Sequence, residues 1–150
     1  MIQVAVVGSE RCDERLYHIA YEVGRLLAER GCVIINGGLG GVMEASSAGA
    51  KLKGGLTVGI IPSDRKEDAN QYTDIIIVTD MGHARNIIIA QSCDAMIAVG
   101  GSYGTISEMA IALKLGKNVV AIEPEVILPG IILAESPEDA VEKALKDLSV

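Results

Sequence analysis

The chain has 150 residues, of which 49% are hydrophobic, and it carries a net charge of −7 with neither Phe nor Trp. The length suits one domain with a single core, which Ile, Val, Leu, Ala and Met must build. The acidity argues against nucleic acid and anionic membranes as partners, because proteins that bind these polyanions need a dense Lys/Arg surface.

Apolar β-rich runs alternate with helix-like runs from the N-terminus onward. The predicted strands are residues 2–7, 32–35, 56–61, 74–79, 95–99 and 119–122. The predicted helices are residues 16–27, 42–53, 82–93, 105–115 and 137–148, the last with Ser136 as N-cap. Small residues in 42–53 predict a close approach of that helix to the sheet, and the polar segment 63–72 is the longest loop and a candidate lid.

This alternation predicts an α/β fold, because right-handed crossovers place the helices on both sides of a parallel sheet. We expect one Rossmann-like, doubly wound nucleotide-binding domain over residues 1–150. Its sheet is expected to be mainly parallel and six- or seven-stranded, with helices on both faces.

The cysteines and the N-terminus indicate the compartment. Cys12, Cys32 and Cys93 are widely spaced and form neither a disulfide framework nor a metal-ligand pattern. The first residues have no basic stretch before their short apolar run. We therefore expect a cytoplasmic protein with reduced thiols and no metal site.

Sheets of this kind bind ligands at the carboxyl ends of their strands, where the strand order reverses. Three predicted strands end in glycine-rich segments that we take as candidate ligand- and phosphate-binding residues: Gly8, Ser9, Gly37, Gly38, Gly40, Gly41, Gly100, Gly101, Ser102, Tyr103, Gly104 and Thr105. Neither cluster of glycines is a nucleotide fingerprint of the common kinds, because Met43 occupies the third glycine position of a GxGxxG pattern and no GxxxxGK[ST] is present.

The segment VGGSYGTISE, from Val99, has two interpretations. In the first, Thr105 and Glu108 form a capping box and the glycines only permit a tight turn. In the second, the backbone N–H groups of 101–105 hold a phosphate at a helix start, where the missing Cβ atoms make room, and Glu108 faces the ligand. Three glycines are more than a cap requires, which favours the second interpretation.

Arg85 is predicted in the first turn of a helix, where the helix dipole is unfavourable for a cation. It is either an exposed surface arginine or a functional one that pairs with a ligand anion or with Glu108. His83 and His18 are expected to face solvent, and Cys93 to lie on the apolar side of its helix.

Together, MGHARN (from Met81), GGSYGTISE (from Gly100) and the preceding GGLGGVME resemble the Lonely Guy (LOG) superfamily of Rossmann-like proteins, formerly labelled "possible lysine decarboxylases". Within it, the sequence looks closest to the branch that includes molybdenum-cofactor carrier proteins. The resemblance implies a phosphoribohydrolase whose catalytic pair is Arg85 and Glu108. Lysine decarboxylase activity is not expected, because that pyridoxal-phosphate chemistry needs a Schiff-base lysine and Lys117 lies at the wrong end of a strand.

Two departures from the family's enzymatic motifs matter. Val99 stands where the motif has proline, and Ala84 and Asn86 flank Arg85 where the motif reads ERK. The resemblance therefore implies a phosphate pocket more strongly than it implies hydrolysis.

Two functions remain open for a phosphorylated, nucleotide-like ligand. One is hydrolysis of the N-glycosidic bond of a nucleoside 5'-monophosphate, with Arg85 orienting the ribose phosphate and Glu108 stabilising the oxocarbenium charge or activating water. The alternative is a non-catalytic carrier of the molybdenum cofactor, a phosphorylated pterin. No other cofactor is expected, and a purely structural or regulatory domain is a third reading. The apolar helix around 109–116 predicts a homodimer or homotetramer.

Overall fold

A computed structural model gives the structure of residues 1–148. Seven strands form one sheet in the order β4-β3-β2-β1-β5-β6-β7, and every neighbouring pair is parallel. The strands are β1 (Gln3–Gly8), β2 (Val33–Asn36), β3 (Thr57–Ile61), β4 (Ile75–Val78), β5 (Ala95–Val99), β6 (Asn118–Ile122) and β7 (Ile132–Ala134). The predicted Rossmann-like α/β fold is confirmed, and the sheet is entirely parallel.

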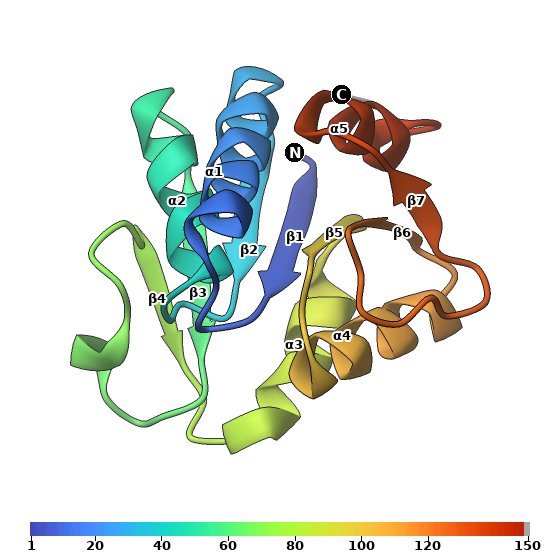
Figure 1. Cartoon of the computed structure of the whole chain (residues 1–150). Helices are drawn as coiled ribbons and strands as arrows, with labels where there is room; N and C mark the ends of the chain where they lie inside the picture. Colours follow the sequence, from blue (N-terminus) through green and yellow to red (C-terminus); the bar gives the residue numbers. More distant parts are fainter. Residues whose placement is uncertain (149–150) are drawn as a thin grey trace.

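Helices cover both faces of the sheet, as predicted. The helices are α1 (Glu14–Glu29), α2 (Val42–Leu52), α3 (Arg85–Ser92), α4 (Tyr103–Lys114) and α5 (Pro137–Leu145), with short 3-10 turns η1 (Lys66–Asp68) and η2 (Gly82–Ala84). Figure 1 shows α1, α2 and α5 on one side of the sheet and α3 and α4 on the other. Ser136 caps α5 by accepting a hydrogen bond from the Asp139 amide at 3.0 Å.

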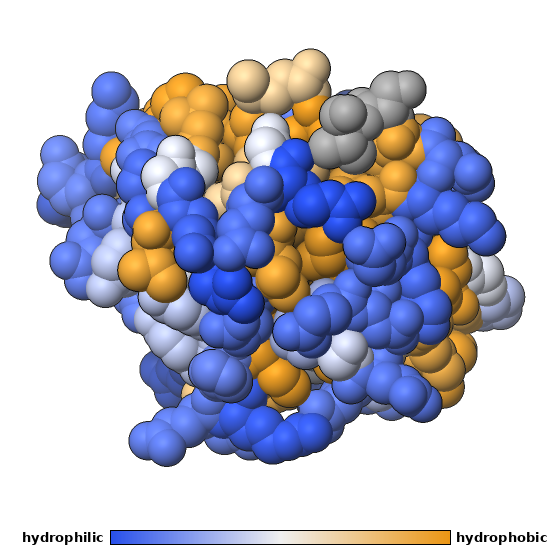
Figure 2. Space-filling model, turned by 90° about the horizontal axis from the view of Figure 1, so that it is seen from above, coloured by the Kyte–Doolittle hydropathy of each residue, from blue (hydrophilic) through white to orange (hydrophobic). Residues whose placement is uncertain are grey.

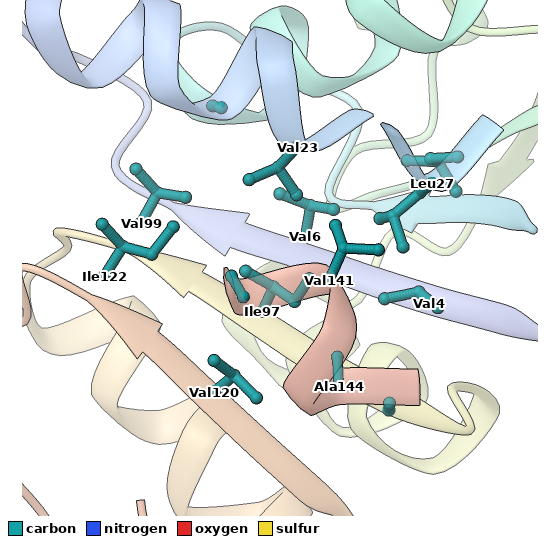
Figure 3. Packing of buried hydrophobic residues seen from close by; sticks show 14 of the residues in the cluster. Val4, Val6, Val23, Leu27, Ile97, Val99, Val120, Ile122, Val141 and Ala144 are labelled. Atoms are coloured by element: carbon teal, nitrogen blue, oxygen red, sulfur yellow. The ribbon is translucent and has the colours of Figure 1, made fainter. Parts of the chain in front are cut away.

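Each face of the sheet has its own apolar cluster. Figure 3 shows the cluster under α1 and α5, where Val23 and Leu27 of α1 and Val141 of α5 pack on strand residues such as Val6 and Ile97. Alternate residues of the same strands point to the other cluster, beneath α3 and α4. Because the central strands are buried on both faces, their sequences are continuous apolar runs.

The small residues of α2 make two close contacts: the Asn36 side chain at the end of β2 donates to Ser47 Oγ at 2.8 Å, as the expected approach to the sheet requires, and α1 packs closely against α2 as well. A Cβ on Gly24 of α1 would lie 1.9 Å from the carbonyl oxygen of Ser46, and one on Gly49 of α2 would lie 1.9 Å from that of Tyr21. The two helices therefore meet backbone to backbone. This contact requires glycine on both of them.

The connection from β3 to β4 contains only η1 and no α-helix, so β4 is poorly covered. Three of its residues are more than a third exposed: Ile75, Ile77 and Val78. The opposite edge strand, β7, was not among the predicted ranges, because three residues are too few to give a pattern.

Figure 2 views the molecule from the side of α1, α2 and α5, where hydrophilic side chains lie between apolar patches. The partly exposed side chains of α1 form ion pairs, with Arg25 binding Glu22 at 2.5 Å and Glu29 at 2.8 Å. Within residues 1–148, no helix has the length and apolar character needed to cross a membrane.

Candidate functional site

The strand order reverses between β1 and β5. From β1 the chain builds outward through β2, β3 and β4, and it then returns to the other side of β1 with β5. Gly8 at the end of β1 lies opposite Val99 at the end of β5, and the loops that follow diverge. A cleft of about 670 Å³ opens there, which is within the usual range for small-molecule sites.

The structure brings most of the predicted site residues to this cleft. Its walls include Gly8, Ser9, Gly37, Arg85, Ser102, Gly104, Thr105 and Glu108. Gly100 and Gly101 line an adjoining cavity of about 220 Å³ instead. Gly38, Gly40, Gly41 and Tyr103 line neither cavity.

Sequence reasoning missed other residues of the cleft wall, among them Glu10, Arg11, Met43, Pro62 and Asn86. His83 is exposed, as expected, and it also lines the cleft. Glu10 and Arg11 directly follow Gly8-Ser9, so the rule that ligands bind at strand carboxyl ends could have found them. Met43 and Asn86 are buried residues of helices, and nothing in the sequence separates them from core positions.

Arg85 is buried at 7% exposure, so the exposed-surface alternative is wrong. Its Nε donates to the carbonyl oxygen of Ile60 at 2.9 Å, one Nη donates to Asn86 Oδ1, and the other reaches the carbonyl oxygen of Gly37 at 3.5 Å. Burial lowers the pKa of Arg85, and the negative potential of Glu108 and Glu10 opposes this effect. Arg85 is therefore a fixed positive charge in the wall of the cleft.

Glycine at position 37 makes room for this arginine. A Cβ there would lie 2.5 Å from an Nη atom of Arg85 and 2.7 Å from the sulfur of Met43. Gly37 thus serves the placement of Arg85 as well as the wall of the cleft.

Glu108 is also 7% exposed, and no hydrogen bond or ion pair among residues 1–148 involves its carboxyl group. Burial raises the pKa of Glu108 to about 8, and the charge of Arg85 lowers it only in part. A carboxyl group in such a position holds a proton at neutral pH and can donate it. Among residues 1–148 no fully buried side-chain N or O atom lacks a partner, so the unpartnered carboxyl oxygens of Glu108 keep some accessible area, and they lie in the wall of the cleft, where a ligand can reach them.

The capping-box interpretation is wrong. Helix α4 starts at Tyr103 with Ser102 as its N-cap residue, so Thr105 lies inside the first turn and Glu108 lies in the second. The Ser102 side chain makes no capping hydrogen bond. The first backbone N–H groups of α4 therefore remain available beside the cleft, and such groups bind anions.

The three glycines around the start of α4 are not equally required by the fold. Gly100 and Gly101 have φ values of +57° and +105°, and a Cβ on Gly101 would lie 2.5 Å from the Thr105 side chain. Their conformation alone explains glycine there. Gly104 has no atom within 4 Å of an added Cβ, so the protein itself does not require glycine at this position on the cleft wall.

The glycines at the start of α2 hold the loops together. Gly41 has a φ of +60°, a Cβ there would lie 2.3 Å from the carbonyl oxygen of Ser9, and the Val42 amide donates to that oxygen at 3.1 Å. This contact fixes the β1–α1 loop, which forms one side of the cleft.

The candidate lid, residues 63–72, is attached to the β2–α2 loop. The Asn70 amide donates to the carbonyl oxygen of Gly38 at 2.8 Å, and its side chain donates to that of Leu39 at 2.9 Å. None of the segment's residues lines the cleft, although Pro62 just before it does.

Comparison with known proteins extends these findings. The model of the SLOG cluster4 family matches residues 1–148. An uncharacterized protein of Archaeoglobus fulgidus is 60% identical over 94% of this chain and 93% of its own length. A cytokinin riboside 5'-monophosphate phosphoribohydrolase of Mycobacterium tuberculosis is 35% identical over 73% of this chain, and the match spans only 63% of that enzyme.

Solved structures with the same fold include two proteins whose names refer to binding or carrying the molybdenum cofactor. The molybdenum cofactor binding protein of Rippkaea orientalis superposes with a TM-score of 0.89 at 38% identity, covering 94% of this chain and 93% of that one. The molybdenum cofactor carrier protein of Chlamydomonas reinhardtii gives 0.83 at 31% identity, covering 96% and 98%. The DNA processing protein A of Streptococcus pneumoniae is less similar, with 0.75 at 25% identity over 93% of this chain and 60% of that one.

Proposed function

Because the chain belongs to the SLOG cluster4 family, we propose that it binds a phosphorylated, nucleotide-like small molecule in the cleft between β1 and β5. The observation that carries this proposal is Glu108, a largely buried residue of the cleft wall whose carboxyl group keeps some accessible area and has no hydrogen-bond partner within residues 1–148. The uncapped start of α4 supplies N–H groups for the phosphate, and Arg85 supplies positive charge.

The proposed reaction is hydrolysis of the N-glycosidic bond of a nucleoside 5'-monophosphate. Water adds to C1' of the ribose, the bond from C1' to the base nitrogen breaks, and the base leaves with a proton. Glu108, with its pKa near 8, is suited to donate that proton at neutral pH, which replaces the expected roles of stabilising the oxocarbenium charge or activating water, since both need the ionised carboxylate. The water proton returns to the carboxylate, so the products are the free base and ribose 5-phosphate.

A specific observation favours the alternative function, a non-catalytic carrier of the molybdenum cofactor. The match to the molybdenum cofactor binding protein covers nearly all of both chains, whereas the match to the mycobacterial hydrolase spans only 63% of that enzyme. In this case the α4 start would hold the phosphate of the pterin, and Glu108 would donate a hydrogen bond to the bound molecule.

Incubation of the purified protein with AMP tests the two functions. A hydrolase releases adenine and ribose 5-phosphate in equal amounts, and Glu108→Gln lowers kcat by about 100-fold or more because the proton donor is lost. Glu138→Gln, which changes an exposed carboxyl group of α5, serves as the matched control. A carrier leaves AMP intact, and the purified protein shows pterin fluorescence after oxidation. Failure to bind either AMP or a phosphorylated pterin would contradict the proposal as a whole.

Partners and location are part of the same proposal. Exposed Ile75, Ile77 and Val78 of β4, with Ile87 of α3, add apolar surface to that already expected of α4, and we propose a homodimer or homotetramer. A cytoplasmic location is proposed together with it. The net charge of −7 still argues against nucleic acid as the partner, although one structural neighbour is a DNA processing protein.

A further inference from the structure

Arg11 lies where the two cavities at the switch point meet. It follows β1 by three residues, and it lines both the 670 Å³ cleft and the 220 Å³ cavity that Gly100 and Gly101 help to form. Ser9 is the other residue that lines both. Gly100 and Gly101 line the smaller cavity, whereas Ser102, Gly104 and Thr105 line the cleft. Arg11 therefore borders the same spaces as this turn and the start of α4.

The arginines near this space differ in what their guanidinium groups already bind. Arg85 directs three of its N–H groups at protein oxygens. Arg15, which lines the smaller cavity, forms an ion pair with Glu123. Arg11 is exposed, and none of the hydrogen bonds or ion pairs among residues 1–148 involves it. All five of its N–H groups are therefore available to a ligand.

We infer that Arg11 clamps the phosphate of the ligand, while Arg85 acts on the part of the ligand that contacts Glu108. This inference rests on the proposed function and deepens it. A guanidinium group matches two oxygens of a phosphate monoester, and this paired arrangement is stronger and more directional than a contact with a neutral donor. The phosphate would lie between the guanidinium group of Arg11 and the first N–H groups of α4.

The buried position of Arg85 and Glu108 supports this division. Arg85 is held by the carbonyl oxygens of Ile60 and Gly37 from β3 and the end of β2, and through Asn86 it is linked to Ser107 in the second turn of α4, next to Glu108. Glu10 also lines the cleft, and its negative charge would repel a phosphate unless a nearby cation offsets it. Arg11, the next residue, can supply that cation. The phosphate and the reacting bond are thus assigned to different arginines.

Isothermal titration of the full chain with AMP and with adenosine tests the inference. Arg11→Gln is expected to weaken AMP binding by about 10- to 100-fold and to leave adenosine binding unchanged, because only the phosphate contact is lost. Arg11→Lys should give a smaller loss, because the charge remains but the paired geometry does not. Arg30→Gln is the matched control. Arg30 follows the last residue of α1, pairs with Glu142 and lines neither cavity.

Each result is decisive. If Arg11→Gln leaves AMP binding intact, or weakens AMP and adenosine equally, the clamp is not Arg11 and the inference is overturned while the proposed function stands. If the wild-type protein binds AMP no better than adenosine and does not bind a phosphorylated pterin either, the phosphate site itself is absent, and the proposed function and the inference both fail.

Discussion

Replacing Glu108 by Gln should change how the stability of the protein depends on pH. The substitution keeps the shape of the side chain but removes its titration. Burial raises the pKa of Glu108 from its ordinary value of 4.5 to about 8. The folded protein therefore keeps this proton between pH 4.5 and about 8, whereas the unfolded chain releases it. Stability falls as the pH rises through that window, and the loss is complete above pH 8.

The size of the effect follows from the pKa change. A rise from 4.5 to about 8 corresponds to up to about 5 kcal/mol, because one pKa unit is worth about 1.4 kcal/mol. Urea unfolding of the wild type and Glu108→Gln at pH 5 and pH 9 measures it. Between pH 5 and pH 9 the free energy of unfolding of the wild type should fall relative to that of Glu108→Gln. The exposed-site control Glu138→Gln should follow the wild type. An equal difference between Glu108→Gln and wild type at both pH values would refute the reasoning that Glu108 is buried as a neutral acid.

Three further substitutions probe the packing and the cleft. Gly24→Ala should cost about 1–3 kcal/mol in urea unfolding, because the new Cβ would lie 1.9 Å from the carbonyl oxygen of Ser46, and an unchanged midpoint would contradict the backbone contact. Gly104→Ala should instead stabilise the protein by up to about 1 kcal/mol and weaken AMP binding; unaltered binding would mean that this glycine is not kept for the ligand. Asn36→Leu should cost about 1–3 kcal/mol in thermal or urea unfolding, because it leaves the buried amide of Gly38 without its acceptor, and wild-type stability would show that water replaces it.

Much of the fold could be predicted because the strands are short apolar runs that end in glycine or polar residues. The helix start at α4 could not, since Thr105 and Glu108 match a capping box by spacing alone. The structure starts the helix two residues earlier, at Tyr103. The spacing of two residues in the sequence does not show at which residue the helix starts.

The candidate site was predictable in position but not in the roles of its residues. Glycines at strand ends mark the binding edge of a parallel sheet, and the cleft lies there. Sequence cannot separate Gly41, whose Cβ would meet a backbone oxygen, from Gly104, whose Cβ would meet nothing. Burial of Arg85 was equally hidden, because charged side chains are seldom buried and its acceptor Ile60 lies 25 residues away in the chain.

The pairing of β1 with β5 has a consequence during synthesis on the ribosome. Strands β1 to β4 can associate once the first half of the chain has emerged, but Val4 must wait for Ala95 to gain its second neighbour. Until then the nascent chain exposes the open edge of β1, an apolar strand, and open strand edges are sites where incompletely folded proteins aggregate. The ligand pocket does not exist before Glu108 is translated, so small-molecule binding can stabilise only the nearly finished polypeptide.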